Sequence, residues 1–232
     1  MASSFAVLDS NAPEFPGIEA ASTNPNGLLA IGGNLDTDTL LLAYRSGIFP
    51  WYDQDSQIMW WSPDPREILL PDDQHWSRTM RRSFRDARFR ISTDTNFEAV
   101  VEACSRNEEA GVWITDEMRS AYLELNRLGI AHSLEVWQED TIIGGLYGVA
   151  IGSAFCGESM FHRVSNSSKL AFLCLADQLF AQGFEFIDCQ FETDHLRSLG
   201  TRSVSRALYR KYLDKALLRE PAWPSTFGRN IS

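Results

Sequence analysis

The most regular pattern of hydrophobic and polar positions lies in the second half of the chain. Residues 132–138 alternate between apolar and polar side chains, a polar turn follows at residues 139–140, and two further apolar stretches span residues 141–152 and 153–159. A period of two residues with short turns is typical of neighbouring antiparallel strands. We therefore expect an antiparallel meander in this part of the chain.

Helices are expected where apolar residues recur every three or four positions behind a good capping residue. Asn, Asp, Ser and Thr cap helices because their side chains accept a hydrogen bond from a free backbone N–H in the first turn. The expected caps and helices are Asn34 or Asp36 before a helix ending at Gly47, Asn96 before 97–105, Thr115 before 116–128, Asn166 or Ser167 before 168–182, Thr193 or Asp194 before a short helix to Leu199, and Ser203 before 204–218. Short strands are expected at residues 67–70, 88–92 and 184–190.

This order of elements indicates an α+β fold with a central, mostly antiparallel sheet. Two prolines, Pro63 and Pro65, follow a polar stretch, and we place a domain boundary there. The prediction is a small N-terminal domain of residues 1–62 and a larger domain of residues 63–232. Residues 1–26 read as an extended arm, and the tail from Glu220 as loose chain.

Composition indicates a folded protein away from membranes. The chain has 232 residues, of which 44% are hydrophobic and 12% aromatic, so a sizeable core can form. No apolar run approaches the roughly 20 residues of a membrane span. The first residues carry neither a positive segment nor a long apolar one, so we read no signal peptide and expect a cytoplasmic protein.

The cysteines and histidines show no spacing typical of a metal site. The four cysteines, Cys104, Cys156, Cys174 and Cys189, are far apart and form no C-x-x-C pair. We expect buried, reduced thiols and no bound metal. A thiol nucleophile is the less favoured alternative, because no cysteine lies in an evidently electropositive loop beside a histidine.

Basic residues gather in one stretch of a chain whose net charge is −10. Arg78, Arg81, Arg82 and Arg85 are spaced so that a helix would carry all four guanidinium groups on one face. A solvated helix face is the usual role of such a run, but it normally mixes charges of both signs. We favour a contact with the phosphates of a nucleic acid.

Glycine is concentrated in the expected meander. Five of the fifteen glycines lie between Gly144 and Gly157, among apolar residues, and the polar Glu158 follows. Repeated glycine in a strand marks a bulge or a close approach by another group. The stretch is either a plain core hairpin or an apolar site for a small acyl group, with Glu158 as its polar contact.

Two further pairs of residues are candidates for chemistry. Trp51 and Trp113 lie in expected loops, where an aromatic ring can stack on an unpaired base, although most tryptophans fill cores. Asp188 and Gln190 alternate along an expected strand, so they should share one face while Cys189 points away. Such a pair could hold an amine nucleophile, or it could anchor the end of the strand.

Several longer strings resemble the bacterial leucyl/phenylalanyl-tRNA–protein transferases. They include GLLAIGGNL, AYRSGIFPWY, WWSPDPR, GGLYGVAIG, FCGESMF and IDCQ, and the match extends from about Gly27 to Arg206. The resemblance implies transfer of Leu or Phe from charged tRNA to the N-terminal Arg or Lys of a protein, which marks that protein for degradation. It also implies a domain like the acetyltransferases of the GNAT superfamily behind a small N-terminal domain, with no metal or organic cofactor. We expect a monomer.

The resemblance also implies roles for particular residues. Trp51 and Trp113 would enclose the 3′-terminal adenosine of Leu-tRNA or Phe-tRNA. The other expected sites are the apolar pocket walls Leu146, Phe155 and Met160, the polar contact Glu158, the reacting centre with Asp188 and Gln190, and the tRNA phosphate contacts Arg78, Arg81, Arg82 and Arg85. The family usually has a small residue in place of His162, and the residues after IDCQ vary, so the site for the acceptor protein is the least defined.

Two other functions share some of these features. An acyl-CoA-dependent acetyltransferase would have the same fold, but the R/Q-x-x-G-x-G/A loop that binds pyrophosphate is absent from the sequence. A non-catalytic RNA-binding module would explain the arginines and tryptophans, but not an apolar pocket or the IDCQ strand. For the transferase, we expect Asp188 to orient Gln190 and accept charge from the attacking amine. Because an amide is too weak a base to take a proton, a tRNA ribose hydroxyl could relay it.

Overall fold

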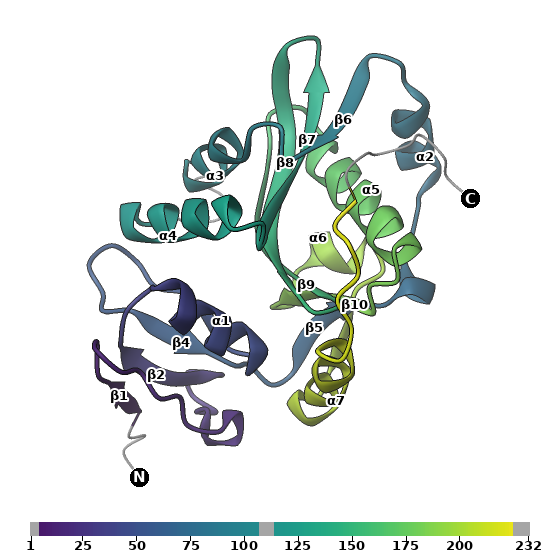
Figure 1. Cartoon of the computed structure of the whole chain (residues 1–232). Coiled ribbons are helices and arrows are strands. Elements are labelled where there is room, and N and C mark those ends of the chain that lie inside the picture. The colour runs from purple at the N-terminus through teal and green to yellow at the C-terminus, as the bar shows by residue number, and fades with distance from the viewer. Residues whose placement is uncertain (1–4, 107–113, 225–232) are drawn as a thin grey trace.

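The computed structural model describes residues 5–106 and 114–224 (Figure 1). A small four-stranded sheet, ordered β1-β2-β4-β3, occupies the N-terminal part. Its elements are β1 (Ala6–Leu8), η1 (Ile18–Ala20), β2 (Leu28–Gly32), α1 (Thr37–Arg45), β3 (Phe49–Pro50) and β4 (Met59–Trp61). The expected arm thus contains a strand, because β1 pairs in parallel with β2. The predicted domain boundary at residue 62 stays a prediction.

A seven-stranded sheet, ordered β11-β5-β10-β9-β8-β7-β6, forms the rest of the framework. Its strands are β5 (Arg66–Leu69), β6 (Phe89–Thr93), β7 (Ala131–Gln138), β8 (Thr141–Ile151), β9 (Ala154–His162), β10 (Phe186–Gln190) and β11 (Arg202–Val204). Neighbouring strands are antiparallel except β9 and β10, which are parallel. The expected meander, the mostly antiparallel sheet and the α+β class are therefore confirmed.

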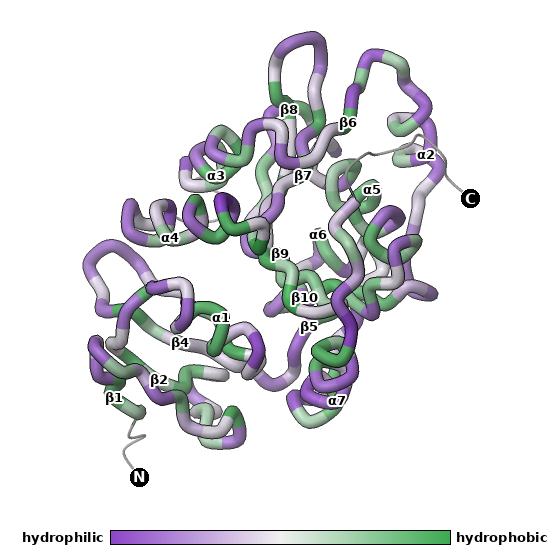
Figure 2. The backbone as a smooth tube through the Cα atoms, viewed as in Figure 1, coloured by the Kyte–Doolittle hydropathy of each residue, from purple (hydrophilic) through white to green (hydrophobic). Residues whose placement is uncertain are grey.

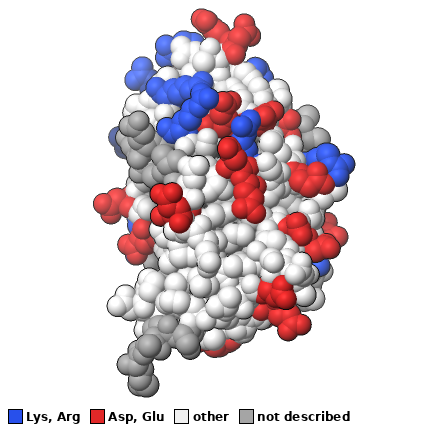
Figure 3. Space-filling model, turned by 90° about the vertical axis from the view of Figure 1, so that its left-hand side faces the viewer, with Lys and Arg blue, Asp and Glu red and all other residues white. Residues whose placement is uncertain are grey.

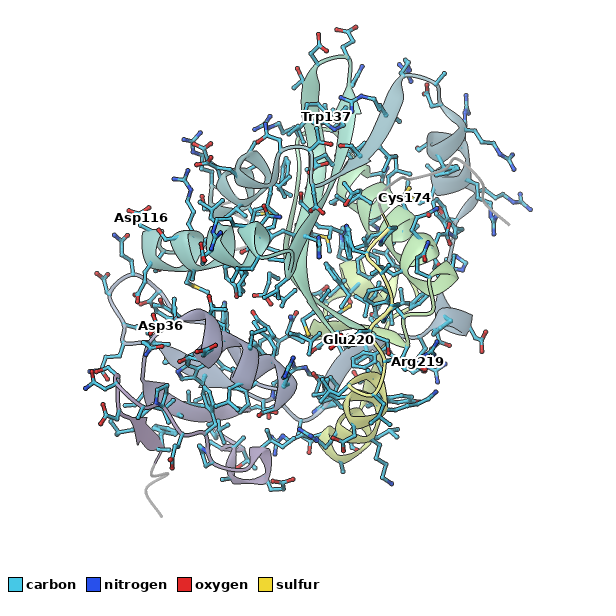
Figure 4. All side chains as sticks on the ribbon, in the orientation of Figure 1. Asp36, Asp116, Trp137, Cys174, Arg219 and Glu220 are labelled. Carbon is cyan, nitrogen blue, oxygen red and sulfur yellow. The ribbon has the colours of Figure 1, made fainter. Side chains whose placement is uncertain are left out.

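Helices cover both faces of this sheet (Figure 1). They are η2 (Pro71–Asp73), α2 (Arg78–Arg85), α3 (Phe97–Ser105), α4 (Asp116–Arg127), α5 (Ser167–Ala181), α6 (Asp194–Arg197) and α7 (Arg206–Ala216). One apolar core joins α3 and α4 to the sheet and to the N-terminal part, and another lies under α5. Hydrophobic residues accordingly follow β9, β10 and α5, whereas the β7–β8 hairpin tip is hydrophilic (Figure 2). The space between α5 and the sheet, where Cys174 is labelled, is filled by side chains (Figure 4).

Capping residues begin most helices where the sequence predicts. Asn96 accepts a hydrogen bond from the N–H of Ala99, and Thr115 accepts one from Met118. The prediction for the last helix is wrong, because Ser203 lies in the edge strand β11 and Ser205 caps α7 instead. Three residues are too few for a strand to show as a pattern of its own.

The C-terminal tail packs against the rest of the protein up to Pro224, so the expectation of loose chain is wrong for this part. The indole of Trp223 lies parallel to the ring of His132, with 3.9 Å between the ring centroids, and its N–H donates to Thr93. It also contacts Phe155 at a centroid distance of 5.5 Å. This part of the tail is thus an integral piece of the core under α5.

Neighbouring protein atoms occupy the space beside most of the clustered glycines. A Cβ on Gly144 would lie 2.4 Å from Oγ of Ser167, and one on Gly148 would lie 2.2 Å from the carbonyl oxygen of Cys156 and 2.6 Å from the ring of Phe155. At Gly157, the nearest atom would be 3.6 Å away. Gly144 and Gly148 therefore let Ser167 of α5 and the ring of Phe155 pack closely on the hairpin, whereas a Cβ on Gly157 would meet its nearest atom at ordinary van der Waals distance.

We predict that Gly148→Ala destabilises the fold. The added methyl group overlaps a backbone oxygen that cannot move freely, so the free energy of unfolding should fall by about 1–3 kcal/mol or more. Urea unfolding followed by circular dichroism measures this change. The matched control Gly157→Ala adds the same group where the nearest atom, the carbonyl oxygen of Asp188, is 3.6 Å away, so its free energy of unfolding should stay within about 0.5 kcal/mol of the wild type. Equal losses in both variants would contradict the steric explanation.

Candidate functional site

A pocket opens where the parallel strands β9 and β10 separate. Their pairing covers only Ala154–Cys156 and Phe186–Asp188, although β9 continues to His162. The opening holds a pocket of about 340 Å³. Five of the predicted site residues line it, namely Leu146, Phe155, Glu158, Met160 and Gln190. Further apolar walls come from Phe172 on α5 and Ile187 on β10. The cavity is thus apolar inside, with polar groups from two diverging strands.

Asp188 lies behind this pocket in a buried ion pair. Its Oδ1 accepts from Nε of Arg66 at 2.8 Å, and its Oδ2 accepts from Nη2 of Arg66 at 2.6 Å and from the hydroxyl of Tyr209 at 2.8 Å. The guanidinium group lies 4.6 Å from the ring centroids of both Phe49 and Tyr209. Burial acts to lower the pKa of Arg66, but the charge of Asp188 and its hydrogen bonds raise that pKa above its ordinary value.

The expectation that Asp188 and Gln190 share a strand face is wrong. The pairing of β10 with β5 shifts register between them, and Gln190 has a φ of +57°. This bulge interrupts the two-residue period, so Cys189 and Gln190 both line the pocket while Asp188 does not. The left-handed conformation is rare outside glycine, and the backbone N–H of Gln190 is held by Oδ1 of Asp188 at 3.0 Å. Asp188 thus acts on the pocket through the backbone of Gln190.

The amide of Gln190 is oriented by the neighbouring strand. Its Nε2 donates to the carbonyl oxygen of Gly157, at 2.5 Å. Because an amide nitrogen only donates and its oxygen only accepts, this bond fixes which end of the side chain is free. The carbonyl oxygen has no hydrogen-bond partner among the described residues, and it is an acceptor suited to an N–H of an amine.

Glu158 is the carboxylate of the pocket, and a chain of two tyrosines holds it. Its Oε2 accepts from the hydroxyl of Tyr122 at 2.6 Å, and the hydroxyls of Tyr122 and Tyr44 lie 2.7 Å apart. Its Oε1 is buried and has no hydrogen-bond partner among the described residues. Burial raises the pKa of Glu158 to about 7; the hydrogen bond from Tyr122 acts to lower this pKa, and nearby Asp188 acts to raise it.

The tyrosine chain links the N-terminal part to the pocket. Tyr44 belongs to α1 and Tyr122 to α4, two helices that lie side by side (Figures 1 and 4). In Figure 4, Asp36 and Asp116 label the beginnings of these helices. Both tyrosines occupy apolar helix positions, so the sequence pattern assigns them to the core. The pattern gives no sign that their hydroxyl groups form a chain to Glu158.

Trp51 lies beside the rim of the pocket. Its ring is 40% exposed and lies 5.4 Å from the ring of Phe191, the residue that follows Gln190. It also contacts Trp61 at 5.5 Å. An exposed indole supported on two sides by aromatic rings offers a flat surface for stacking. Trp113, its predicted partner, lies outside the described residues.

The predicted arginine face is present on α2. Arg78, Arg81, Arg82 and Arg85 are exposed and line one surface hollow together with Asp86. None of the four forms an ion pair with a described carboxylate, since Asp86 is paired with Arg88. Figure 3 shows acidic side chains scattered over the left-hand side of the molecule in Figure 1, whereas α2 lies at its right. Part of the negative net charge is thus remote from this face.

Two histidines border the other end of the pocket. His162 ends β9, and His195 lies on α6, with its Nε2 buried and without a partner in the described part of the chain. Burial lowers the pKa of His195, and Lys169 and His162 lower it further. No pattern in the sequence brings the two histidines together, since His162 is the last residue of a strand and His195 lies in a four-residue helix.

The state of the cysteines agrees with the expectation from the sequence. All four cysteines are buried and unpaired, and burial raises the pKa of Cys104 to about 12. Among the residues that the structure describes, no group of three or more His, Cys, Asp or Glu could hold a metal ion. Within the same residues, no helix combines the length and hydropathy needed to cross a membrane.

We predict that Arg66→Met strongly destabilises the protein. The substitution keeps the length of the side chain but leaves Asp188 buried without its counter-charge, which should cost about 3–5 kcal/mol in the free energy of unfolding. Urea unfolding measures the loss. Arg127→Met is the matched control: Arg127 pairs with Glu124 on the surface, so its loss should cost at most about 1 kcal/mol. Similar costs for both variants would contradict the importance of the buried pair.

The comparison with solved structures gives only distant matches. A GCN5-related N-acetyltransferase-like protein from Streptococcus suis 89/1591 has a TM-score of 0.36 and 12% identity over 73% of this chain and 64% of that chain. A conserved protein of unknown function from Bacteroides thetaiotaomicron VPI-5482 has a TM-score of 0.44 and 14% identity over 78% of this chain and 67% of that chain. Similarities this distant assign no activity.

Sequence relatives are much closer. The family model described as "Leucyl/phenylalanyl-tRNA protein transferase" matches residues 68–214, and the model of that family's N-terminal domain matches residues 33–64. The leucyl/phenylalanyl-tRNA–protein transferase of Pseudomonas fluorescens (strain Pf0-1) is 50% identical over 90% of this chain and 94% of its own length. That of Pseudomonas putida (strain KT2440) is 52% identical over 88% and 91%. The chain therefore belongs to the leucyl/phenylalanyl-tRNA–protein transferase family.

Proposed function

We propose that this protein transfers a leucyl or phenylalanyl group from aminoacyl-tRNA to the N-terminal Arg or Lys of acceptor proteins. The transfer forms a peptide bond and marks the acceptor for degradation. The observation that carries the proposal is the apolar pocket whose polar rim holds Glu158 and Gln190, in a chain of this family. An acyl-CoA-dependent acetyltransferase and a non-catalytic RNA-binding module are not favoured by the family assignment.

The donor tRNA would place its 3′ end at the pocket. The terminal adenine would stack on Trp51, with Trp113 as the expected second ring, and stacking of this kind contributes about 1–3 kcal/mol per base. The leucyl or phenylalanyl side chain would enter between Leu146, Phe155 and Met160. Such a pocket distinguishes side chains by only about 1–3 kcal/mol per methylene, so methionine should be accepted less well.

The acceptor amine would meet the ester at Gln190. Because Nε2 of Gln190 is bound to Gly157, its carbonyl oxygen is free to accept from the attacking amine. Asp188 would act as a positioning residue, since its carboxylate holds the bulge that presents Gln190. Holding the two reactants in place lowers the barrier by several kcal/mol without any cofactor.

The remaining parts of the proposal concern the setting of the reaction. We include in the proposal an acceptor with N-terminal Arg or Lys, a cytoplasmic location and a monomeric state. The four arginines of α2 would bind the phosphates of the tRNA acceptor stem, because exposed guanidinium groups without carboxylate partners attract a polyanion.

Direct transfer tests the main proposal. Purified protein is mixed with radiolabelled Leu-tRNA and a peptide that begins with Arg, and label in the peptide is measured. We expect label on the free peptide and none on the same peptide with an acetylated N-terminus, whose nitrogen cannot attack. Acetyl transfer from acetyl-CoA without tRNA, or absence of label on both peptides, would refute the proposed reaction.

We predict that Arg81→Ala with Arg82→Ala weakens tRNA binding. Log affinity falls as log salt concentration rises, and removing two phosphate contacts should make the slope of this fall shallower by about 1 to 2. The control carries Arg119→Ala with Arg127→Ala on α4, which changes the net charge equally on another helix. Equal effects of the two pairs would show that net charge, rather than the α2 face, controls tRNA affinity.

A further inference from the structure

The reaction needs a group that removes a proton from the attacking amine. Asp188 does not suit this task, because its two oxygens already accept four hydrogen bonds and it does not line the pocket. The amide of Gln190 is too weak a base. His195 lines the pocket, but the groups that face it are Lys169 and His162, at the other end.

Glu158 has the geometry that Asp188 lacks. It follows Gly157, whose carbonyl oxygen accepts from the amide of Gln190, and Glu158 and Gln190 both line the pocket. Its Oε1 is buried and has no partner among the described residues, and Glu158 is one of the residues that line the pocket. A buried carboxylate oxygen without a partner is costly unless a ligand supplies a donor.

The other oxygen of Glu158 is fixed in place. Tyr122 donates to Oε2, and Tyr44 lies in hydrogen-bond contact with Tyr122. The ring of Tyr122 packs edge-on against Tyr147, with 5.4 Å between centroids. These contacts hold Oε2 in place and leave Oε1 without a hydrogen-bond partner among the described residues.

We propose that Glu158 is the general base of the transfer reaction and that Tyr122 and Tyr44 are positioning residues that hold it. This proposal rests on the proposed function and assigns the proton transfer within it. The Oε1 atom accepts a proton from the acceptor's α-amino group, while the carbonyl oxygen of Gln190 holds a second N–H.

The atoms of the step balance without a further reactant. The amine nitrogen forms a bond to the carbonyl carbon of the aminoacyl ester, and its proton moves to Glu158. The bond between that carbon and the 3′ oxygen of the tRNA then breaks with its electron pair on oxygen. Glu158 returns the proton to this oxygen, so the products are a peptide and a tRNA with a free hydroxyl, and the carboxylate is regenerated.

The charges around Glu158 suit a base that works near neutral pH. Burial raises its pKa to about 7, and a base is most effective when its pKa lies near the working pH. The titratable and charged groups that face it come from six elements, and they are Tyr44 of α1, Arg66 of β5, Tyr122 of α4, Tyr147 of β8, Cys156 of its own β9 and Asp188 of β10.

The direction of the pH dependence follows from these contacts. Glu158 acts when ionised, so transfer should rise with pH through its pKa. The hydrogen bond from Tyr122 acts to lower that pKa. Tyr122→Phe removes the bond but keeps the ring, so the pKa should increase and the rising limb of the pH profile should move to higher pH. The amine of the acceptor also titrates, at about 7.7–8.0, but it is the same in both measurements.

The experiment measures kcat/KM for an Arg-starting peptide from pH 5.5 to 9 with saturating Leu-tRNA. We expect Glu158→Gln to transfer about 10²–10⁴-fold more slowly at unchanged tRNA affinity, because an amide cannot take the proton. We expect Tyr122→Phe to move the rising limb of the pH profile to higher pH. The matched control Tyr212→Phe on α7 should leave the limb at its wild-type pH. Thermal unfolding confirms that each variant is folded.

Two results would overturn the assignment. One is transfer by folded Glu158→Gln at the wild-type rate, and the other is an unshifted limb in Tyr122→Phe while Glu158→Gln is slow, which would leave Glu158 as a binding residue only. Both leave the proposed function standing, because they require an active wild-type protein. An inactive wild-type protein would instead refute the proposed function itself.

Discussion

The buried ion pair between Arg66 and Asp188 is the contact on which the rest of the site depends. Two charges removed from water are costly, and the cost is offset only when every donor and acceptor is satisfied. Here the rings of Phe49 and Tyr209 flank the guanidinium group, and Tyr209 also donates to the carboxylate. Elements from both sheets and from α7 therefore meet at one pair. The bulge at Gln190 follows, because the same carboxylate binds the backbone N–H that the bulge exposes.

The ion pair also explains why two neighbouring carboxylates, Asp188 and Glu158, have different roles. Asp188 forms an ion pair with Arg66, whereas Oε2 of Glu158 accepts from Tyr122 and its buried Oε1 has no hydrogen-bond partner among the described residues. Different surroundings thus give one acid a structural role and the other a titration near neutral pH, as is common in catalytic sites. The nearby charge of Asp188 contributes to that difference, since it raises the pKa of Glu158. A buried ion pair and a tunable acid are consequently parts of one electrostatic arrangement.

Much of the fold could be predicted from the sequence, because strand periods and helix caps are local signals. The meander and the caps at Asn96 and Thr115 depend on neighbours a few residues away. The apolar walls of the pocket were named through the family resemblance. The Arg66–Asp188 pair joins positions 122 residues apart, and no local pattern indicates it. The strand period failed at Gln190 because a distant ion pair stabilises a conformation that the local pattern does not favour. Of the two interpretations of the hairpin glycines, the structure favours close packing in the core at Gly144 and Gly148, where Ser167 and Phe155 occupy the space.

The N-terminal part is more than an attachment to the larger sheet. It contributes Tyr44 to the chain that holds Glu158, Phe49 to the cover of Arg66, and Trp51 to the rim beside Phe191. Each contact reaches a different component of the pocket: its base, its framework and its stacking surface. A pocket built by the larger sheet alone would lack all three. The site therefore forms only when the N-terminal part is packed against α4 and β10, and the packing that stabilises this junction is also what prepares the pocket for chemistry.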